Sequence, residues 1–127
     1  MDNHGTVWWT ELNTFEPAKA RAFYQALLGW EFDEMPMPGG TYLVARIGDE
    51  MVAGIFDMKA GGLPKETPSH WFTYIAVDDV DLRVKQVVTL GGKVLREPWD
   101  IPGVGRVAII MDAAGAGVGL MTPSKAN

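Results

Sequence analysis

The chain contains no cysteine among its 127 residues, which excludes disulfide bonds and any chemistry that needs a thiolate. It has no stretch of eighteen apolar residues, so it offers no candidate membrane helix. Its first residues have neither the basic flank nor the unbroken apolar run of a signal peptide. We therefore expect a soluble, cytoplasmic protein.

Positive charge is also scarce, with 11 Lys and Arg against 16 Asp and Glu and a formal net charge of −5. No run of Lys or Arg occurs, which disfavours nucleic acid and anionic membrane as partners. Glycine and proline are plentiful and lie mostly between apolar runs, as in β-rich domains with many turns. The length predicts a single domain over residues 1–127.

A strand followed by a helix occurs near the start of the chain. Residues 7–12 are rich in aromatic and β-branched side chains and predict a strand. Thr14 is then a candidate N-cap, Pro17 a first-turn proline, and Gly29 the residue that ends the helix. The predicted apolar stripe of this helix is Ala20, Phe23, Tyr24, Leu27 and Leu28.

The same pattern returns about sixty residues later, which indicates an internal repeat. Residues 70–77 predict a strand that turns at Asp78 and Asp79, and a helix then ends at Gly91 and Gly92. The apolar stripe of this second helix is Val80, Val84, Val87 and Val88.

Shorter elements complete each copy. Further strands are expected over residues 30–32, 42–47, 51–58, 93–96, 104–111 and 117–122. Residues 35–40 and 98–103 read as breaks, and residues 1–5 as a loose arm. The prediction is β-α-β-β-β written twice, with module one over residues 6–58, a linker over 59–69 and module two over 70–122. A module alone leaves one sheet face bare, so the two sheets either join or face a partner chain.

Three groups of residues recur in one known family. The first is Glu16-(x)3-Ala20-(x)2-Phe23-Tyr24 followed by Leu28-Gly29-Trp30. The second is Val77-Asp78 leading to Leu90-Gly91-Gly92, and the third is Asp112-(x)2-Gly115 before the last strand. In these motifs the chain resembles the vicinal oxygen chelate superfamily, the fold of glyoxalases, bleomycin resistance proteins and extradiol dioxygenases. The resemblance implies an α+β fold of paired βαβββ modules that form cupped mixed β-sheets with helices on the outer face. It also implies a homodimer, because relatives with one such chain usually pair.

The resemblance further implies where a metal would be bound. Metal-using members place His, Gln or Glu ligands on the first and last strand of each module, and these four positions fall here on Trp9, Gly54, Phe72 and Gly119. None of these residues offers a side-chain donor to a divalent cation. We therefore expect a branch of the family that lacks the metal, and no cofactor.

Strand alternation then predicts which side chains share the inner face. If Trp9 and Phe72 point inward, so do Glu11, Asn13, His70 and Tyr74, while Trp8, Leu12 and Trp71 lie under the helices. Glu11 is the candidate catalytic residue, since a carboxyl group facing an aromatic cup would have a raised pKa and act as a general base or hold a polar ligand. Alternatively, Glu11 pairs with Arg46, Arg106 or a backbone amide and fixes the strand register.

The other candidates have structural alternatives as well. His70 is either a proton shuttle or lone ligand, or a half-exposed residue at a strand entrance. Tyr42 and Tyr74 either present hydroxyl groups to a ligand or simply pack, and packing is favoured. The predicted ligand-binding residues are Trp9, Glu11, Phe56, His70, Phe72, Tyr74, Trp99 and Met121. Their rings either line a pocket or fill it, and Gly54, Gly117 and Gly119 favour an open cavity.

Three classes of function fit these residues. We favour a metal-independent small-molecule binding protein whose aromatic cup takes up a flat or apolar ligand. The alternative is a glyoxalase- or dioxygenase-like enzyme, a lyase or isomerase, that uses Glu11 as general base. A third reading is a structural or regulatory dimer whose cup is filled.

Overall fold

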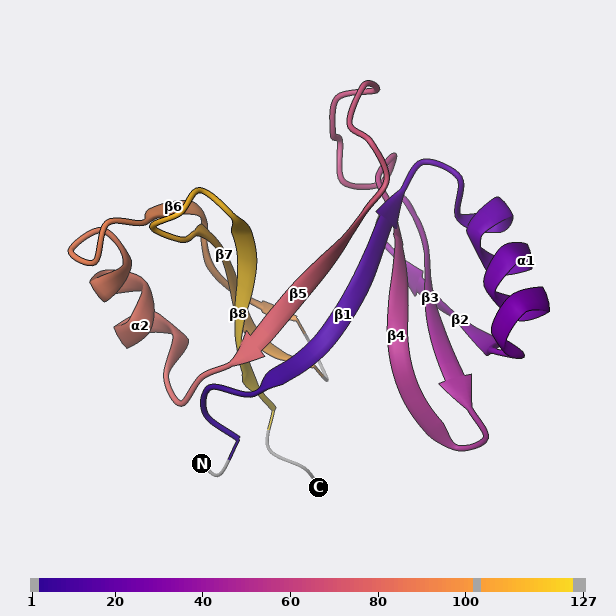
Figure 1. Ribbon diagram of the computed structural model, residues 1–127, viewed down its shortest axis with the longest axis horizontal. Coiled ribbons are helices and arrows are strands. Elements are labelled where there is room, and N and C mark those ends of the chain that lie inside the picture. The colour runs from indigo at the N-terminus through magenta and orange to yellow at the C-terminus, as the bar shows by residue number, and fades with distance from the viewer. Residues whose placement is uncertain (1–2, 102–103, 125–127) are drawn as a thin grey trace. The chain divides into compact units, whose positions relative to one another are not determined.

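The computed structural model describes residues 3–101 and 104–124, which form eight strands and two helices in the order β-α-β-β-β, twice (Figure 1). The elements are β1 (Val7–Thr14), α1 (Pro17–Leu28), β2 (Glu31–Met37), β3 (Gly40–Ile47), β4 (Glu50–Asp57), β5 (His70–Ala76), α2 (Val80–Val87), β6 (Lys93–Ile101), β7 (Gly105–Met111) and β8 (Gly117–Pro123). The predicted α+β class and the repeated module are confirmed. Within the described part of the chain, neither helix has the length and apolarity needed to cross a membrane.

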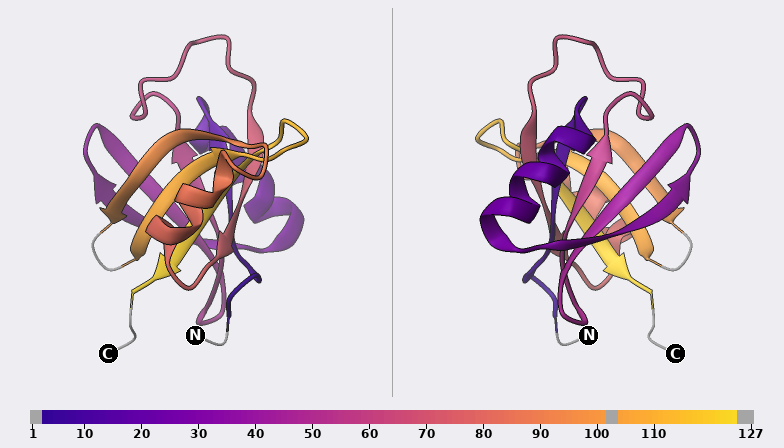
Figure 2. Two further views of the ribbon diagram at one scale, coloured as in Figure 1. Left: turned by 90° about the vertical axis from the view of Figure 1, so that its left-hand side faces the viewer. Right: turned by 90° about the vertical axis from the view of Figure 1, so that its right-hand side faces the viewer.

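The chain divides into two compact units, and the first consists of residues 9–72. Here β1 runs parallel to β4, with Glu11 opposite Gly54, and β3 lies antiparallel between β4 and the edge strand β2. One face of these strands carries Leu12, Leu43 and Ile55, and this small core is covered from α1 by Ala20 and Tyr24. Figure 2 (right) shows α1 on the near side of these strands.

The predicted helix start in this unit is wrong in detail. Glu16, not Thr14, occupies the N-cap position of α1, and its side chain makes no capping hydrogen bond. The Thr14 hydroxyl instead accepts the Glu16 N–H at 3.1 Å and the Ser69 hydroxyl at 2.8 Å. Thr14 therefore ties the end of β1 to the segment that leads into β5.

The second unit contains residues 73–124 and the N-terminal residues up to Trp8. In it β5 runs parallel to β8, with Tyr74 opposite Gly119, and β7 pairs antiparallel with β8 and with the edge strand β6. Figure 2 (left) shows α2 in front of these strands. The Asp79 carboxylate accepts the Leu82 N–H at 3.2 Å as the N-cap of α2. The core residues are Val77, Val80, Val84, Val87, Ala108, Ile110 and Leu120.

The predicted stripe of α2 is therefore correct at three of its four valines. Val88 was also assigned to it, but its side chain is 66% exposed. The helix ends at Val87, so Val88 lies at the C-cap, beyond the last turn that packs on the sheet.

Both predicted breaks begin inside strands, and only Pro38 and Gly39 of the first one interrupt the chain, as the turn between β2 and β3. β2 continues through Pro36 to Met37, and β6 continues through Pro98 to Ile101. Proline cannot donate to a β-ladder, so a proline in a strand normally indicates an end or an edge. Each of these strands is the edge of its unit, and β6 also shifts register on both sides of Arg96. The last part of the predicted 98–103 break, residues 102–103, lies outside the described residues.

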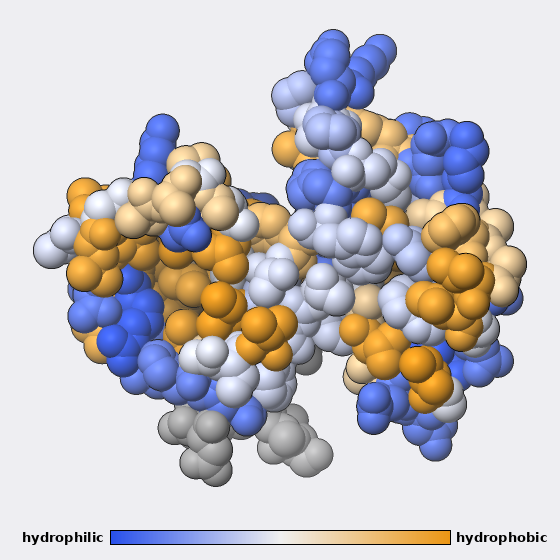
Figure 3. Space-filling view, viewed as in Figure 1, coloured by the Kyte–Doolittle hydropathy of each residue, from blue (hydrophilic) through white to orange (hydrophobic). Residues whose placement is uncertain are grey.

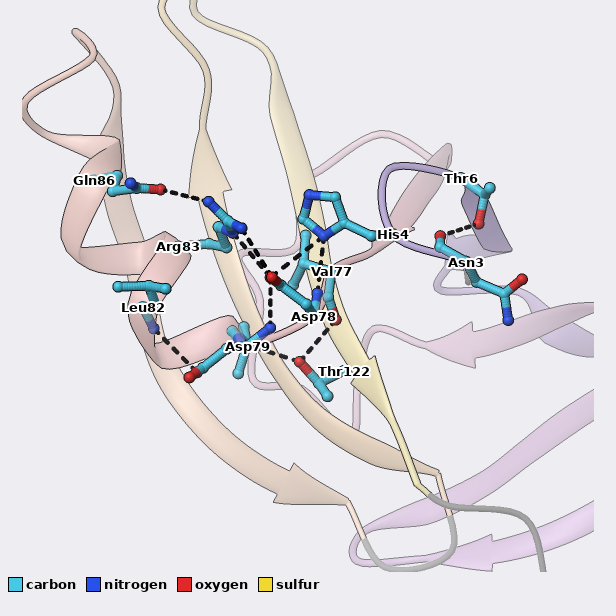
Figure 4. Close-up of polar contacts among 11 residues, drawn as sticks. Asn3, His4, Thr6, Val77, Asp78, Asp79, Leu82, Arg83, Gln86 and Thr122 are labelled. Carbon is cyan, nitrogen blue, oxygen red and sulfur yellow. Dashed lines mark hydrogen bonds and ion pairs between the residues drawn. The ribbon is translucent and has the colours of Figure 1, made fainter. Parts of the chain in front are cut away.

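The loose arm was predicted over residues 1–5. Residues 3–6 are instead held in place by hydrogen bonds (Figure 4), and residues 1–2 lie outside the described residues. His4 Nδ1 accepts the Asp78 N–H at 2.9 Å, and the Gly5 N–H donates to the Ala76 carbonyl at 2.7 Å. Asp78 in turn receives two hydrogen bonds of 2.9 Å from the Arg83 guanidinium, which is the main cause of a pKa lowered to about 2. The arm is thereby attached to the start of α2.

Candidate functional site

The candidate site is built on the face of β1 that points away from α1. Leu12 lies in the core under the helix, so the alternation of the strand places Trp9, Glu11 and Asn13 on the opposite face. The register of β4 places Gly54 beside Glu11 and Phe56 beside Asn13 on that same face. The predicted parity of the first strand is confirmed.

Three side chains on this face form a continuous hydrogen-bonded chain. The Tyr42 hydroxyl donates to Glu11 Oε2 at 2.9 Å, and the Trp9 indole N–H donates to the Tyr42 oxygen at 3.0 Å. The phenol oxygen therefore acts as acceptor and donor at once, which fixes the direction of its proton toward Glu11. We call this group the Trp9–Tyr42–Glu11 chain.

Glu11 is the titratable group that this arrangement perturbs most. Its removal from water raises the pKa from 4.5 to about 7, and the Tyr42 hydrogen bond offsets part of that rise. Burial disfavours the ionised form, whereas a donor to the carboxylate favours it. At neutral pH Glu11 therefore exists in both protonation states, and it can donate or accept a proton.

The predicted ion pairs of Glu11 do not form. Arg46 bonds to Asp33 at 2.8 Å, and Arg106 bonds to Asp81 at 2.8 Å. Both arginines use carboxylates on exposed surfaces. The partner of Glu11 is Tyr42, for which sequence analysis had favoured simple packing.

A signal for Tyr42 was present in the sequence. A glycine within a strand often marks a close approach by another group, and Gly54 lies across the hairpin from Val44, two residues from Tyr42. Large aromatic rings reach such diagonal neighbours in antiparallel pairs. A Cβ added to Gly54 would overlap the Tyr42 phenol, so the ring lies directly over that glycine.

The second unit repeats this feature, because a Cβ on Gly119 would overlap the ring of Tyr74. The prediction that Gly54 and Gly119 keep a cavity open is therefore wrong. In each unit a tyrosine ring takes the space that the glycine leaves.

His70 occupies the strand entrance and is exposed, as its structural alternative proposed. Its Nδ1 lies 2.9 Å from the Pro68 carbonyl, and its Nε2 lies 3.3 Å from the Asn13 amide nitrogen. Since an amide NH₂ can only donate, Nε2 is the acceptor of the Asn13 hydrogen bond, and the Nδ1–H donates to the Pro68 carbonyl. Both ring nitrogens are thus engaged within the protein.

The remaining predicted residues divide between the units. Phe56 and Phe72 belong to the unit of Glu11, and the Phe56 ring lies against Gly61. Tyr74, Trp99 and Met121 belong to the second unit. There the Arg96 guanidinium stacks 3.5 Å from the centre of the Trp99 ring, and Met121 is buried.

A groove of about 330 Å³ lies on the opposite side of β1, beside α1. Sequence analysis did not identify it. Its lining residues are Leu12, Thr14, Glu16, Lys19, Ala20, Phe23, Tyr24 and Ser69.

Comparison with known proteins now assigns the family. The model of the Glyoxalase/Bleomycin resistance protein/Dioxygenase superfamily matches residues 6–120. The chain belongs to this superfamily. Two solved structures support the fold. Hypothetical protein BH1468 from Bacillus halodurans has a TM-score of 0.70 and 15% sequence identity, and the match covers 97% of each chain. Methylmalonyl-CoA epimerase from Mycobacterium tuberculosis has a TM-score of 0.67 and 16% identity, and the match covers 98% of this chain and 93% of that one.

Two curated relatives are more similar in sequence. The protein named "Putative glyoxylase CFP32" of Mycobacterium tuberculosis is 45% identical over 118 residues, which cover 91% of this chain and 45% of the relative. The anthracycline biosynthesis protein DnrV of Streptomyces peucetius is 41% identical over 113 residues, which cover 89% of this chain and 40% of the relative. The chain thus spans less than half the length of these curated relatives.

The metal site of this superfamily does not fit the residues present here. Trp9 uses its only polar atom to donate to Tyr42, Phe72 has no donor atom, and the glycine positions are covered by tyrosine rings. In the described residues, no group of three or more His, Asp or Glu side chains is placed to hold a metal ion. We therefore derive no step of the chemistry through a metal.

Proposed function

We propose that this protein binds a small molecule with an aromatic or apolar body and one polar group, independently of divalent metal. The observation that supports the proposal most is the Trp9–Tyr42–Glu11 chain, in which a carboxyl group removed from water is oriented by a phenol. Protein pockets for small molecules combine apolar walls with a few polar groups of this kind. Glu11 supplies the polar contact, and the rings of Trp9 and Phe56 on the same face of the sheet supply the apolar contact.

The protonation of Glu11 determines which ligands it accepts. In its neutral form Glu11 donates a hydrogen bond to a carbonyl or phenolate oxygen, and in its ionised form it accepts one from a hydroxyl or amine. Because its pKa is about 7, both forms are accessible near neutrality. Flat compounds with keto or phenol groups are the class that this combination favours. The names of the Streptomyces relatives refer to anthracycline biosynthesis, so anthracyclines belong in the first set of test ligands.

A second candidate function is an enzyme that transfers a proton. A general base works best when its pKa lies near the working pH, and Glu11 meets that condition. The relatives named glyoxylase are compatible with this alternative. In it Glu11 removes a proton from a carbon atom next to a carbonyl group, and Tyr42 holds the carboxylate in position.

Calorimetric titration with anthracyclines, flavonoids and simple naphthoquinones tests the binding function. We expect affinity for at least one compound to persist after EDTA treatment. Glu11→Gln should weaken binding roughly tenfold or more, because a hydrogen bond to a charged group contributes about 1.5–3 kcal/mol. Glu66→Gln, which removes the same charge from an exposed loop residue, is the control and should bind as the wild type does.

The same samples separate the two functions. Exchange of the ligand's carbon-bound protons into D₂O, followed by NMR, should equal that in buffer alone for a binding protein. Exchange that is accelerated by the wild type and not by Glu11→Gln would establish the enzyme instead. Affinity that disappears with EDTA and returns with one metal would refute metal independence, and no binding to any compound would refute the binding function.

A further inference from the structure

Helix α1 packs loosely on its strands and leaves a groove beside it. No residue of the helix is buried, and Phe23 and Leu27 remain 57% and 62% exposed. In α2, by contrast, Val80, Val84 and Val87 are all buried. In the space-filling view, apolar side chains gather over the position of α1 (Figure 3). The groove of about 330 Å³ lies beside the N-terminal half of α1, and its volume, at the lower end of the range for small-molecule pockets, suits a small ligand.

A hydroxyl proton beside this groove has no acceptor. Thr14 is 4% exposed and shares the α1 side of β1 with Leu12. Its oxygen accepts the Glu16 N–H and the Ser69 hydroxyl, and within the described part of the chain no atom accepts its own proton. If the bond between the two hydroxyl groups runs in the opposite direction, the proton of Ser69 is left instead. In both cases the pair has one proton to donate, and a buried donor without an acceptor favours a ligand oxygen at this position.

The N-terminus of α1 supplies further donors next to Thr14. No side chain caps this helix, and Pro17 has no N–H, so the N–H groups of Ala18 and Lys19 have no acceptor within the helix. These groups also carry the partial positive charge of the helix dipole, which favours an anion. The Lys19 side chain lines the groove and adds a full positive charge.

Glu16 is the group that competes with an anion here. Its carboxylate lies 3.1 Å from Lys19 Nζ, and both side chains are mostly exposed. Exposed ion pairs contribute little free energy. A ligand carboxylate can therefore replace Glu16 as the partner of Lys19.

The rest of the groove is largely apolar. Leu12 and Ala20 line it together with Phe23 and Tyr24. The Phe23 ring meets the Tyr24 ring edge to face, with the ring centres 5.1 Å apart, so most of the Phe23 ring remains accessible. An aromatic ligand can stack on it.

The corresponding end of α2 lacks these features. Asp79 caps that helix, and Asp81 adds a negative charge in its first turn. The Thr122 hydroxyl accepts the Val80 N–H and donates to the Val77 carbonyl, so it has no proton to offer a ligand. The unused donors are thus a feature of the first unit.

We propose that the α1 groove binds a small aromatic carboxylic acid. Its carboxylate accepts hydrogen bonds from the Thr14–Ser69 hydroxyl pair and from the first-turn N–H groups and pairs with Lys19, while its ring stacks on Phe23. This site is separate from that of the proposed function, because Glu11 and the α1 groove lie on opposite faces of β1.

An NMR titration with cinnamate tests the site, since backbone amide shifts show where the ligand binds. We expect saturable shifts of the Ala18 and Lys19 amides with a dissociation constant of about 1 mM, as for a ligand of this size. Cinnamyl alcohol has the same ring and chain without the charge, and it should bind roughly fivefold more weakly or worse.

Substitutions on the groove should change the affinity in opposite directions. Lys19→Met and Thr14→Val should each weaken cinnamate binding roughly threefold or more, whereas Thr14→Ser keeps the hydroxyl and should bind as the wild type does. Glu16→Gln should strengthen binding roughly twofold or more, because it removes the competing carboxylate. The matched control is Lys85→Met, which removes an exposed lysine of α2 and should leave the affinity unchanged. The Lys19 and Glu16 substitutions alter only exposed side chains, so they decide the test even if Thr14→Val does not fold.

The absence of amide shifts in α1 at up to about 20 mM cinnamate would overturn the proposal. So would equal binding of cinnamyl alcohol, or equal effects of Lys19→Met and Lys85→Met. Glu11→Gln should leave the α1 shifts unchanged. Loss of cinnamate binding in that variant would assign the ligand to the Glu11 face, which would overturn the α1 site and leave the proposed function standing.

Discussion

Glu11→Gln should change how stability depends on pH, and the structure gives both the sign and the size. In the unfolded chain the carboxyl group loses its proton near pH 4.5, whereas in the folded protein it keeps the proton until about pH 7. Between these values the folded state binds more protons than the unfolded state, so stability falls as pH rises. The stabilisation is complete below pH 4.5 and is lost above pH 7.

The pKa difference corresponds to about 3 kcal/mol of unfolding free energy between those limits. The glutamine side chain of the variant would be neutral throughout and could still accept the Tyr42 hydroxyl. We therefore expect the variant to match the wild type near pH 4.5 and to exceed its unfolding free energy by about 3 kcal/mol at pH 8. Other ionisable groups are common to both proteins and cancel in the comparison.

Urea unfolding followed by tryptophan fluorescence at several pH values measures this difference. Tyr42→Phe should have the opposite effect on the pH dependence of stability, because it removes the hydrogen bond that lowers the Glu11 pKa. Its unfolding free energy should depend on pH more steeply than that of the wild type. If the difference between wild type and Glu11→Gln varied by less than about 0.5 kcal/mol from pH 4.5 to 8, Glu11 would not have the burial described here.

Two further substitutions test the packing. Gly54→Ala should lower the unfolding free energy by about 2 kcal/mol or more, since the new methyl group overlaps Tyr42. The control is Gly40→Ala, whose added Cβ meets only ordinary contacts, and it should change the unfolding free energy by less than about 0.5 kcal/mol. Equal effects of the two substitutions in thermal unfolding would contradict the close approach of Tyr42. Thr122→Val should lower the unfolding free energy by about 1–3 kcal/mol, because the Thr122 hydroxyl accepts the Val80 N–H and donates to the Val77 carbonyl, both at 3.0 Å (Figure 4). A variant as stable as the wild type would show that water replaces these two hydrogen bonds.

Much of the fold was predictable because it rests on local patterns. The alternation of β1 placed Glu11 and Leu12 on opposite faces, and the valine spacing of α2 identified its buried side. The edge strands were not predictable in the same way. Pro36 and Pro98 read as breaks, since only the order of strands in a sheet shows that a proline lies at an edge.

The candidate site was predictable in part. The resemblance to the family placed Trp9 and indicated the missing metal donors, and strand parity counted from Trp9 then identified Glu11. The role of Tyr42 was missed, since 31 residues separate it from Glu11 and only the β1, β4 and β3 registers bring them together. The α1 groove was missed for a similar reason: periodicity shows that a helix has an apolar stripe, and it does not show how much of that stripe the sheet covers.

The sequence alone determined the order of elements, the face of each strand and the absence of thiol chemistry, because these follow from residue type and from periods of two or 3.6 residues. The tertiary structure decided the partner of Glu11, the ring that covers Gly54 and the exposure of Phe23 and Leu27. Each of these depends on distances between segments far apart in the chain. Such distances are set by packing, which no local pattern contains.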